Sequence, residues 1–402
     1  MSADSFRARV LVVPDSNSAE KELQLIGVDP AGIASMTPKM LHRCIHLKAL
    51  KCHQANIIKQ EMLSVGGDAA VARGTVACSI ATTDVVIMGT EKQLLLFCAK
   101  LLKQPFGLPK LAAEIRRVLE NTVTTRQWLT SKRVLSLERP LIMGILNVTP
   151  DSFSDGGRYM DPLRAIDRAM QMVDEGADII DIGGESTRPG SSGVDAEEEI
   201  RRTAPVIAAL TGTLPCPISV DTWKSEVARE AMASGAEIIN DISGFSFDPR
   251  MSEVAAASGA GIVLMHTRGK PGEMQHNTEY SDIIGEISSV LGASMDAALA
   301  AGIAADKIVL DPGIGFGKSV EGNLTILKRL AEFNSLGRPL LIGTSRKSFI
   351  SRCLNRSTGE LSYGTAATVA VAVANGASIL RVHDVKAMRD AADMAYAMTF
   401  SQ

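Results

Sequence analysis

The last two-thirds of the chain repeats one pattern eight times: a short apolar run that ends in polar or glycine residues, followed by a stretch of helical character. Near-continuous apolar runs are typical of parallel strands that are buried on both faces. The predicted strands are Leu141–Thr149, Ala177–Gly184, Pro217–Thr222, Glu237–Gly244, Gly261–Thr267, Ile308–Gly313, Pro339–Ser345 and Ala377–Asp384. Eight such units over roughly 265 residues match a (β/α)8 TIM barrel, whose usual size is about 250 residues.

An open doubly wound sheet is the alternative. It rarely contains eight such even units, and no glycine-rich dinucleotide-binding turn follows the first predicted strand. We therefore predict an α/β chain in which a (β/α)8 TIM barrel follows a smaller α/β domain. The active site of a TIM barrel lies at the carboxyl ends of the strands, and all eight predicted strands end in chemically functional side chains.

The first 125 residues have a different pattern. Three predicted strands alternate there with helical segments, which indicates a small α/β domain of unknown function at residues 1–125. These strands are Ala8–Val13, His42–Leu47 and Asp84–Met88. We predict a linker at Asn121–Lys132 and a short strand at Arg133–Glu138 under the barrel domain, residues 133–402. No catalytic constellation is visible in the first domain, so an oligomerisation or regulatory module is favoured over a second enzyme.

Composition argues against several classes of protein. The 42 Lys and Arg nearly balance the 45 Asp and Glu, and aromatic residues make up only 4% of the chain, which argues against a nucleic-acid-binding surface. No apolar run approaches the ~18–20 residues of a membrane span, and Met1–Arg9 lacks the apolar core of a signal peptide. Six cysteines without a CxxC motif do not make a disulfide framework. We expect a cytoplasmic enzyme with small-molecule substrates and no nucleic-acid or membrane partner.

Two sets of side chains at the predicted strand ends point to chemistry. Carboxylate and amide groups that converge in the mouth of a barrel suit a planar ligand with several N–H donors, although a solvated rim or helix caps are the alternative. This set is Asp221, Asn240 and Asp311. A basic set suits phosphate or pyrophosphate, with surface ion pairing as the alternative. It comprises Arg188, Arg346, Lys347, Arg381 and His383.

Three loop and strand segments have two interpretations each. The polar segment Asn147–Gly157, with Phe153, is predicted to be a mobile lid, although ordinary loops use the same residues. Gly313–Ser319 resembles a phosphate-binding loop, but Pro312 stands where that motif needs glycine, so we interpret it as the loop after the sixth strand. The alternating residues His42, Cys44 and His46 match no common zinc spacing, and strand packing is favoured over a metal site.

Seven motifs in the second domain identify a resemblance. They are NVTPDSFSDGG (147–157), DIGGESTRPG (181–190), SVDT (219–222), INDISG (239–244), DPGIGFGK (311–318), GTSRKSFI (343–350) and RVHDV (381–385). In this order they resemble dihydropteroate synthase of folate biosynthesis, and the resemblance covers about Arg133–Phe400. It implies condensation of 6-hydroxymethyl-7,8-dihydropterin pyrophosphate with 4-aminobenzoate to give 7,8-dihydropteroate and pyrophosphate. It also implies Mg²⁺ as cofactor, a homodimer, and competition by sulfonamides.

The resemblance also implies roles for individual residues. The pterin would be held by Asp221, Asn240, Met265, Asp311 and Lys347. The pyrophosphate would be bound by Asn147, Arg188, Arg381 and His383, with Asn147 also binding Mg²⁺. The aminobenzoate would be framed by Phe153, Thr187, Pro189, Phe316 and Ser345. The catalytic group would be Asp151, Lys347, Arg381 and His383, where Asp151, rather than Asp155, assists developing positive charge.

Two other functions are weighed against this one. A pterin-binding methyltransferase acting on methyltetrahydrofolate shares the acidic pterin pocket, but it does not need the anion-binding residues Arg188, Arg381 and His383. A non-catalytic pterin- or phosphate-binding homologue would be expected to have lost motif residues, and none is missing here.

Overall fold

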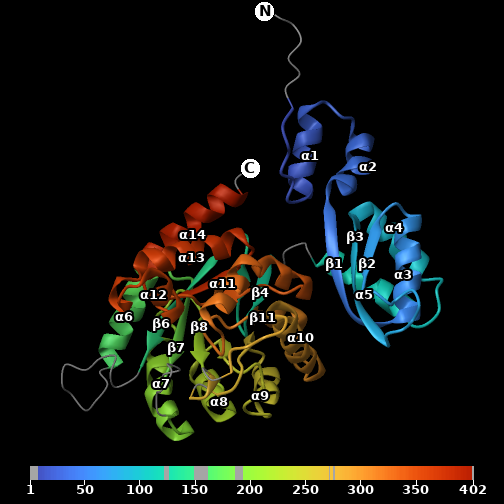
Figure 1. The fold of residues 1–402 in the computed structure, drawn as a ribbon. Coiled ribbons are helices and arrows are strands. Elements are labelled where there is room, and N and C mark those ends of the chain that lie inside the picture. The colour runs from blue at the N-terminus through green and yellow to red at the C-terminus, as the bar shows by residue number, and fades with distance from the viewer. Residues whose placement is uncertain are drawn as a thin grey trace, which may run out of the picture. The chain divides into compact units, whose positions relative to one another are not determined.

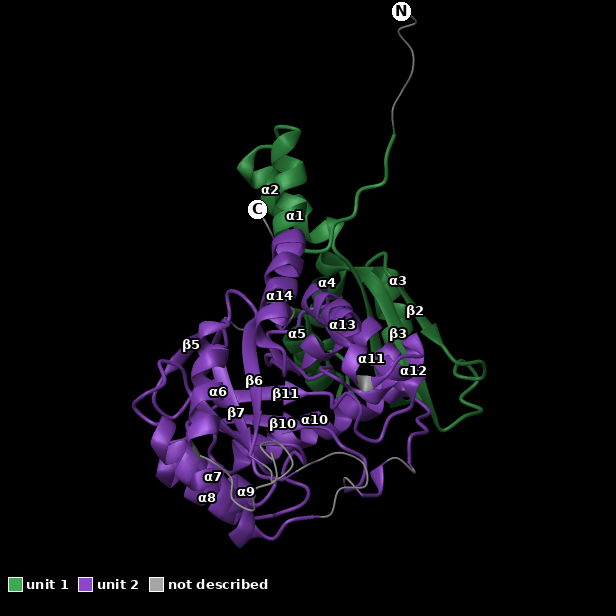
Figure 2. Cartoon of the chain, turned by 90° about the vertical axis from the view of Figure 1, so that its left-hand side faces the viewer, with its two compact units in different colours: residues 1–120 green, residues 121–402 purple. Residues whose placement is uncertain are grey.

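The computed structural model describes residues 8–121, 126–148, 162–185, 193–270, 272–274 and 277–400. The chain forms two compact units, Met1–Glu120 and Asn121–Gln402, which are coloured separately in Figure 2. Each unit has a hydrophobic core of its own.

The first unit is a three-stranded antiparallel sheet with the strand order β1-β3-β2. Its elements are α1 (Ser16–Leu25), α2 (Pro30–Met40), β1 (His42–Lys51), α3 (Cys52–Ser64), β2 (Asp68–Val71), β3 (Thr82–Thr90), α4 (Glu91–Leu101) and α5 (Leu108–Glu120). Inward residues of β3, such as Val85 and Ile87, are buried in a core with residues of α3, α4 and α5. The sheet is therefore amphipathic, with one face buried beneath helices.

Two sequence predictions for this unit need correction. Residues 8–13 form no strand, whereas α2 and β2 were not predicted. The alternating residues His42, Cys44 and His46 do share one face of β1, but all three are exposed, so core packing does not explain them.

The second unit contains eight parallel strands that form a closed ring. They are β6 (Leu141–Asn147), β7 (Ile179–Gly183), β8 (Ile218–Asp221), β9 (Ile238–Asp241), β10 (Gly261–Met265), β11 (Ile308–Asp311), β12 (Leu341–Ile342) and β13 (Ile379–Val382). From β6 to β11, each strand pairs with the next strand in the chain. Strand β13 pairs with both β12 and β6, and a parallel bridge between Leu310 and Leu340 closes the ring. The predicted TIM barrel is confirmed.

An outer ring of helices surrounds these strands (Figure 1). They are α6 (Pro162–Asp174), α7 (Ala196–Leu210), α8 (Ser225–Ser234), α9 (Met251–Ser258), α10 (Ile283–Ala300), α11 (Val320–Lys328), α12 (Ser348–Leu354), α13 (Ser362–Ala374) and α14 (Val385–Phe400). Within the described part of the chain, α10 alone has the length and hydropathy of a membrane span. It packs against β10 and β11 as one of the barrel helices.

The base of the barrel is closed by a hairpin, of which the sequence predicted the second strand, within Arg133–Glu138, but not the first. Strands β4 (Gln127–Leu129) and β5 (Val134–Ser136) pair antiparallel. Trp128 is fully buried against the lowest inward side chains of the barrel, and its Nε1–H donates to the backbone oxygen of Lys307 at 2.9 Å. Residues 127–129 therefore belong to the barrel unit, although they lie within the segment that we had predicted to be a linker.

The alternation of side chains along each strand sets the position of the polar residues. In β7, Ile180 and Ile182 belong to the core shared with the helices, whereas Ile179 faces the barrel interior. Asp181 is therefore the next inward residue towards the carboxyl end. The same alternation in β9, β11 and β13 places Asn240, Asp311 and Arg381 above an apolar inward residue.

Candidate active site

Polar groups replace the aliphatic side chains that usually fill the upper interior of a TIM barrel. Asp181, Asn240 and Asp311 are each at most 6% exposed. Buried charges are costly unless they are paired, so this concentration requires a compensating network or a ligand.

Arg381 is the centre of that network. Its Nε donates to Asp181 Oδ2 at 2.6 Å, and its Nη2 donates to Asp221 Oδ2 at 2.5 Å. Asn240 Nδ2 also donates to Asp181 Oδ2, at 3.2 Å. The second oxygen of each carboxylate, Asp181 Oδ1 and Asp221 Oδ1, is buried without a hydrogen-bond partner. Because buried acceptors are rarely left unpaired, these oxygens are candidates to accept hydrogen bonds from a ligand.

Burial moves the pKa of two groups towards neutrality. It raises the pKa of Asp221 to about 7, although attraction to Arg381 opposes the change. Burial also lowers the pKa of Lys347 to about 7, against the attraction of Asp311. Perturbed groups of this kind are concentrated at functional sites, and a bound ligand readily changes their charge.

The turn after β12 brings Ser345 and Lys347 into the site, whereas Arg346 between them points away from it. Arg346 has a φ of +58°, a left-handed conformation that is uncommon for a non-glycine residue. Its guanidinium pairs outside with Asp384, with Nη2 to Oδ1 at 2.5 Å. Ser345 is buried beside His383, with Oγ 3.0 Å from Nδ1, and Lys347 Nζ donates to the Ile314 carbonyl at 2.7 Å. Arg346 therefore pairs on the surface, the alternative that the sequence left open for it.

An apolar wall borders these polar groups. Met265 and Phe316 belong to a small buried cluster together with Ile242 and Met274. Lys347 Nζ lies 4.0 Å from the centroid of the Phe316 ring. A flat ring could thus stack against this wall while its edge meets the polar groups.

The loop after β11 passes very close to the backbone that follows β10. Gly313 has a φ of +71°, and a Cβ there would collide with the carbonyl oxygen of His266. Lys318 supports the loop from below, since its Nζ donates to the Phe316 carbonyl at 2.8 Å. This is a barrel loop rather than a nucleotide-binding loop, as the sequence indicated.

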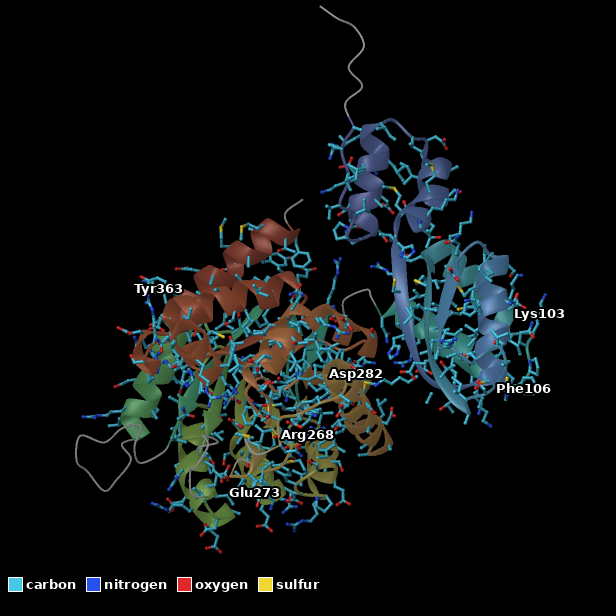
Figure 3. All side chains as sticks on the ribbon, in the orientation of Figure 1. Lys103, Phe106, Arg268, Glu273, Asp282 and Tyr363 are labelled. Atoms are coloured by element: carbon cyan, nitrogen blue, oxygen red, sulfur yellow. The ribbon has the colours of Figure 1, made fainter. Side chains whose placement is uncertain are left out.

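The loop after β10 is fastened to the same region. Arg268 lies 3.9 Å from the centroid of Tyr280 and binds Glu286 at 2.7 Å; Arg268 is labelled in Figure 3. The Tyr280 hydroxyl donates to the Gly317 carbonyl at 3.0 Å. These contacts join two neighbouring loops at the mouth of the barrel.

Asn147 ends β6 and is the residue expected to contact Mg²⁺. A Cβ on neighbouring Gly183 would lie 3.7 Å from Asn147 Oδ1 and 3.6 Å from Asp221 Oδ2, so the glycine keeps space open beside these oxygens. Mg²⁺ usually takes only one or two protein oxygens and fills its other positions with water and substrate phosphate. The residues present fit such an ion. No group of three or more His, Cys, Asp or Glu residues suited to a metal occurs in the described ranges.

The structure brings together the predicted site residues that it describes. They lie in barrel strands or in the loops that follow their carboxyl ends, and they are Asn147, Asp221, Asn240, Met265, Asp311, Phe316, Ser345, Lys347, Arg381 and His383. The predictions for Asp151, Phe153, Thr187, Arg188 and Pro189, and for most of the lid, fall outside the described residues.

Sequence reasoning missed two groups around the site. Asp181 begins the motif DIGGESTRPG (181–190), and its charge at an inward position of an otherwise aliphatic strand is the sequence signal that indicates a function for it. Lys224 is buried and bridges Glu185 and Glu199, with its Nζ 2.5 Å from an oxygen of each. This second network fastens the end of β7 to α7.

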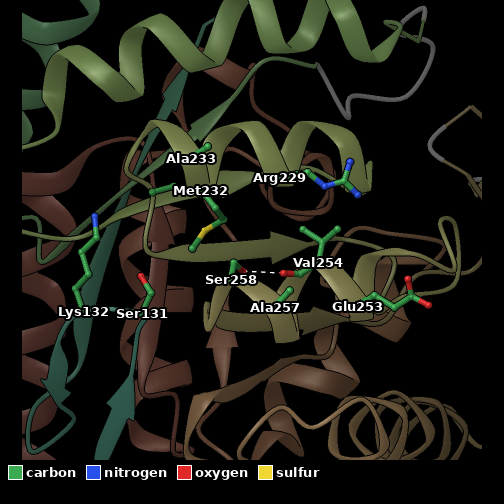
Figure 4. Close-up of a pocket in the computed structure, with 10 residues that line it drawn as sticks. Ser131, Lys132, Arg229, Met232, Ala233, Glu253, Val254, Ala257 and Ser258 are labelled. Atoms are coloured by element: carbon green, nitrogen blue, oxygen red, sulfur yellow. Dashed lines mark hydrogen bonds between the residues drawn. The ribbon is translucent and has the colours of Figure 1, made fainter.

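A groove of about 740 Å³ lies at the other end of the barrel (Figure 4). It is lined by Ser131 of the base hairpin, Met232 of α8 and Val254 of α9, and Ala236 in its wall precedes β9. TIM-barrel activity resides at the carboxyl ends of the strands, so this groove is not the candidate active site.

Comparison with known proteins identifies the family of the barrel unit. Residues 143–383, more than half of the chain, match the family of pterin binding enzymes. The dihydropteroate synthase of Synechocystis sp. is 50% identical over 262 residues, which are 65% of this chain and 91% of that protein. The chain belongs to the dihydropteroate synthase family. The predicted resemblance is confirmed, and it favours the synthase over the methyltransferase.

Solved structures of this family have the same fold. Dihydropteroate synthase from Yersinia pestis, in complex with a sulfonamide drug, is 42% identical with a TM-score of 0.65, covering 68% of this chain and 98% of that one. The Xanthomonas albilineans dihydropteroate synthase in complex with 7,8-dihydropteroate is 38% identical with a TM-score of 0.63, covering 69% and 100%.

One relative also matches the first unit. A probable bifunctional folylpolyglutamate synthase/dihydropteroate synthase of Halobacterium salinarum is 40% identical over 373 residues, 93% of this chain but only 45% of that protein. The second unit ends the chain and begins at Asn121, so a match of this length must extend into the first unit. The small N-terminal domain is thus shared with another member of the dihydropteroate synthase family.

Proposed function

We propose that this chain condenses 6-hydroxymethyl-7,8-dihydropterin pyrophosphate with 4-aminobenzoate, releasing 7,8-dihydropteroate and pyrophosphate. The main support for this proposal is the cluster of buried hydrogen-bond acceptors at the carboxyl ends of the strands, which lies against an apolar wall. Lys347 lies beside this cluster as a hydrogen-bond donor in its protonated form, which two carboxylates, Asp221 and Asp311, favour. A dihydropterin ring offers the matching N–H donors and carbonyl acceptor.

In this proposal the pterin is held by hydrogen bonds along its edge and by an apolar contact on one face. Asp221, Asn240 and Asp311 accept from ring N–H groups, and Lys347 donates to a ring acceptor. Met265 covers one face of the ring, supported by its contacts within the buried apolar cluster.

The pyrophosphate is bound by Arg381, His383 and Arg188, with Asn147 holding Mg²⁺. When bound, Mg²⁺ would neutralise charge on the departing pyrophosphate. Arg381 already neutralises two carboxylates, so it acts as a shared cation between the acidic pocket and the anion. His383 is oriented by Ser345 through its ring nitrogen and its backbone N–H.

The chemical step needs no strong protein nucleophile. The pterin C–O bond lengthens first, pyrophosphate takes the bonding electron pair, and the methylene gains positive charge that the pterin ring shares. Carboxylates in a buried pocket can stabilise such charge. The amine of 4-aminobenzoate then attacks the methylene to form the C–N bond, and the proton that the resulting ammonium loses passes to solvent water. Phe316, Ser345, Phe153, Thr187 and Pro189 frame the aminobenzoate, and Asp151 assists the developing positive charge.

The proposal also covers the cellular location, the oligomeric state and the partners of the enzyme. We place the enzyme in the cytoplasm as a homodimer whose partners are its small-molecule substrates. The balanced charge of the chain, −3 overall, is consistent with the absence of a nucleic-acid partner.

Sulfonamide competition tests this function with a matched pair of variants. Wild-type enzyme should form 7,8-dihydropteroate, and a sulfonamide should raise the apparent KM for 4-aminobenzoate without changing kcat. Lys347→Met should abolish turnover, whereas Arg346→Met should keep most of it, because Arg346 pairs with Asp384 outside the pocket. Turnover of methyltetrahydrofolate in place of the pterin pyrophosphate would contradict the proposal.

A further inference from the structure

Asp181 is the most buried charged residue of the pocket and has no role so far. It lies in the middle of β7, is 0% exposed, and faces the barrel interior. Its Oδ2 accepts from both Asn240 Nδ2 and Arg381 Nε. It therefore contacts two of the residues proposed to bind substrate without lying at the end of its strand.

The contact with Asn240 has a chemical consequence. An ionised carboxylate can only accept hydrogen bonds, so the amide of Asn240 must turn its NH₂ group towards Asp181. The carbonyl oxygen of Asn240 is then directed to the other side of the amide. The side chain that could otherwise present either polarity is fixed as an acceptor.

The contact with Arg381 has a second consequence. Asp181 and Asp221 hold two different nitrogens of the guanidinium, at 2.6 and 2.5 Å. A planar guanidinium held at two points has its orientation fixed. Asp181 thus sets both the polarity of Asn240 and the orientation of Arg381.

We propose that Asp181 is a positioning residue that makes the pocket specific for pterin rings carrying an N–H donor opposite Asn240. This inference rests on the proposed function. It assigns Asp181 no contact with the reacting atoms; its effect is transmitted through Asn240 and Arg381.

Exchanging the partners tests the proposal. Asp181→Asn removes the obligate acceptor and frees the Asn240 amide to rotate. Asn240→Asp places two carboxylates in contact. The double variant Asp181→Asn/Asn240→Asp restores one donor and one acceptor with the roles reversed, while residue 240 still offers an acceptor oxygen to the ligand and the net charge is unchanged.

Calorimetric titration of each full-length variant with the pterin pyrophosphate in Mg²⁺ gives the readout. Hydrogen bonds to charged groups contribute about 1.5–3 kcal/mol, so each single variant should bind roughly 10- to 100-fold more weakly. The double variant should recover at least about 10-fold over the weaker single variant. Because the rescue can also be measured against Asn240→Asp, poor folding of Asp181→Asn alone leaves the test intact.

Asp178→Asn is the matched control. Asp178 precedes the same strand at the base of the barrel and pairs with Arg389 at 2.7 Å, so its loss should reduce thermal stability but change pterin affinity less than about twofold. A double variant that binds no better than the weaker single variant would overturn the positioning role. Wild-type enzyme that binds no pterin pyrophosphate would overturn the proposed function, and this inference with it.

Discussion

Replacing Arg381 with Met leaves two buried carboxylates without their shared cation. The guanidinium lies 2.6 Å from Asp181 and 2.5 Å from Asp221, whose side chains are 0% and 9% exposed. At an effective dielectric constant of about 20, charges about 4 Å apart attract by about 4 kcal/mol. Loss of that attraction raises the pKa of Asp221 further above its present value of about 7, and 4 kcal/mol is enough to keep this carboxyl protonated through about pH 9.

The sign of the stability change follows from proton linkage. Between pH 4 and 7, folded Asp221 is protonated and the same carboxyl in the unfolded chain is not, so the contribution of Asp221 to the free energy of unfolding falls as pH rises in both proteins. Above pH 7 the wild-type carboxyl has ionised, and the contribution of Asp221 becomes constant. In the variant, the contribution of Asp221 continues to fall by about 1.4 kcal/mol per pH unit. The difference in free energy of unfolding between wild type and variant therefore grows by roughly 3 kcal/mol between pH 7 and 9, which corresponds to about 5–11 °C in Tm.

Thermal unfolding followed by circular dichroism from pH 5.5 to 9 measures this effect. Arg389→Met is the control, because Arg389 also pairs with two aspartates, Asp178 and Asp393, but these remain 19% and 50% exposed. Its deficit should stay constant above pH 7. An equally constant deficit in Arg381→Met would refute the reasoning about buried charge in the pocket.

Three further predictions concern other parts of the chain. Lys347→Ala should abolish turnover and leave Tm within a few degrees, as assayed by product formation and melting; wild-type rates would remove Lys347 from the site. Trp128→Ala should lower the free energy of unfolding by about 3–5 kcal/mol, because the ring is fully buried and its Nε1–H donates to the Lys307 carbonyl. A loss below about 1 kcal/mol in a denaturant titration would contradict the role of Trp128 in closing the base of the barrel. A chain that begins at Arg126 should stay folded and active. A chain that begins at Thr130 lacks Trp128, so its free energy of unfolding should fall by about as much as that of Trp128→Ala. Equal Tm values for the two shortened chains would contradict this prediction.

The barrel was predictable because its strands follow a strong and repeated pattern. A parallel strand buried on both faces needs a continuous apolar run, and side-chain alternation then fixes which residues face inward. The sequence therefore located Asp221, Asn240 and Asp311 at one end of the barrel. It could not predict the bond between Asp181 and Arg381, because these residues are 200 positions apart and the bond depends on closure of the ring.

The errors arose where local signals were weak or misleading. Helix α2 contains Gly32 and Pro38 but is started by Asp29, whose side chain caps the backbone N–H groups of Ala31 and Gly32. Strand β2 has only four residues, too few to show alternation. Residues 127–129 are short and flanked by polar residues, and only their burial against the barrel base shows that Trp128 is part of the core.

Pyrophosphate release by the full-length enzyme tests the central claim most directly. The enzyme is supplied with Mg²⁺ and the pterin pyrophosphate, with and without 4-aminobenzoate, and dihydropteroate is measured in parallel. We predict release that depends on 4-aminobenzoate and equals the dihydropteroate formed. Binding of the pterin without any release, or release that does not respond to 4-aminobenzoate, would contradict the assignment of this barrel as a dihydropteroate-forming enzyme.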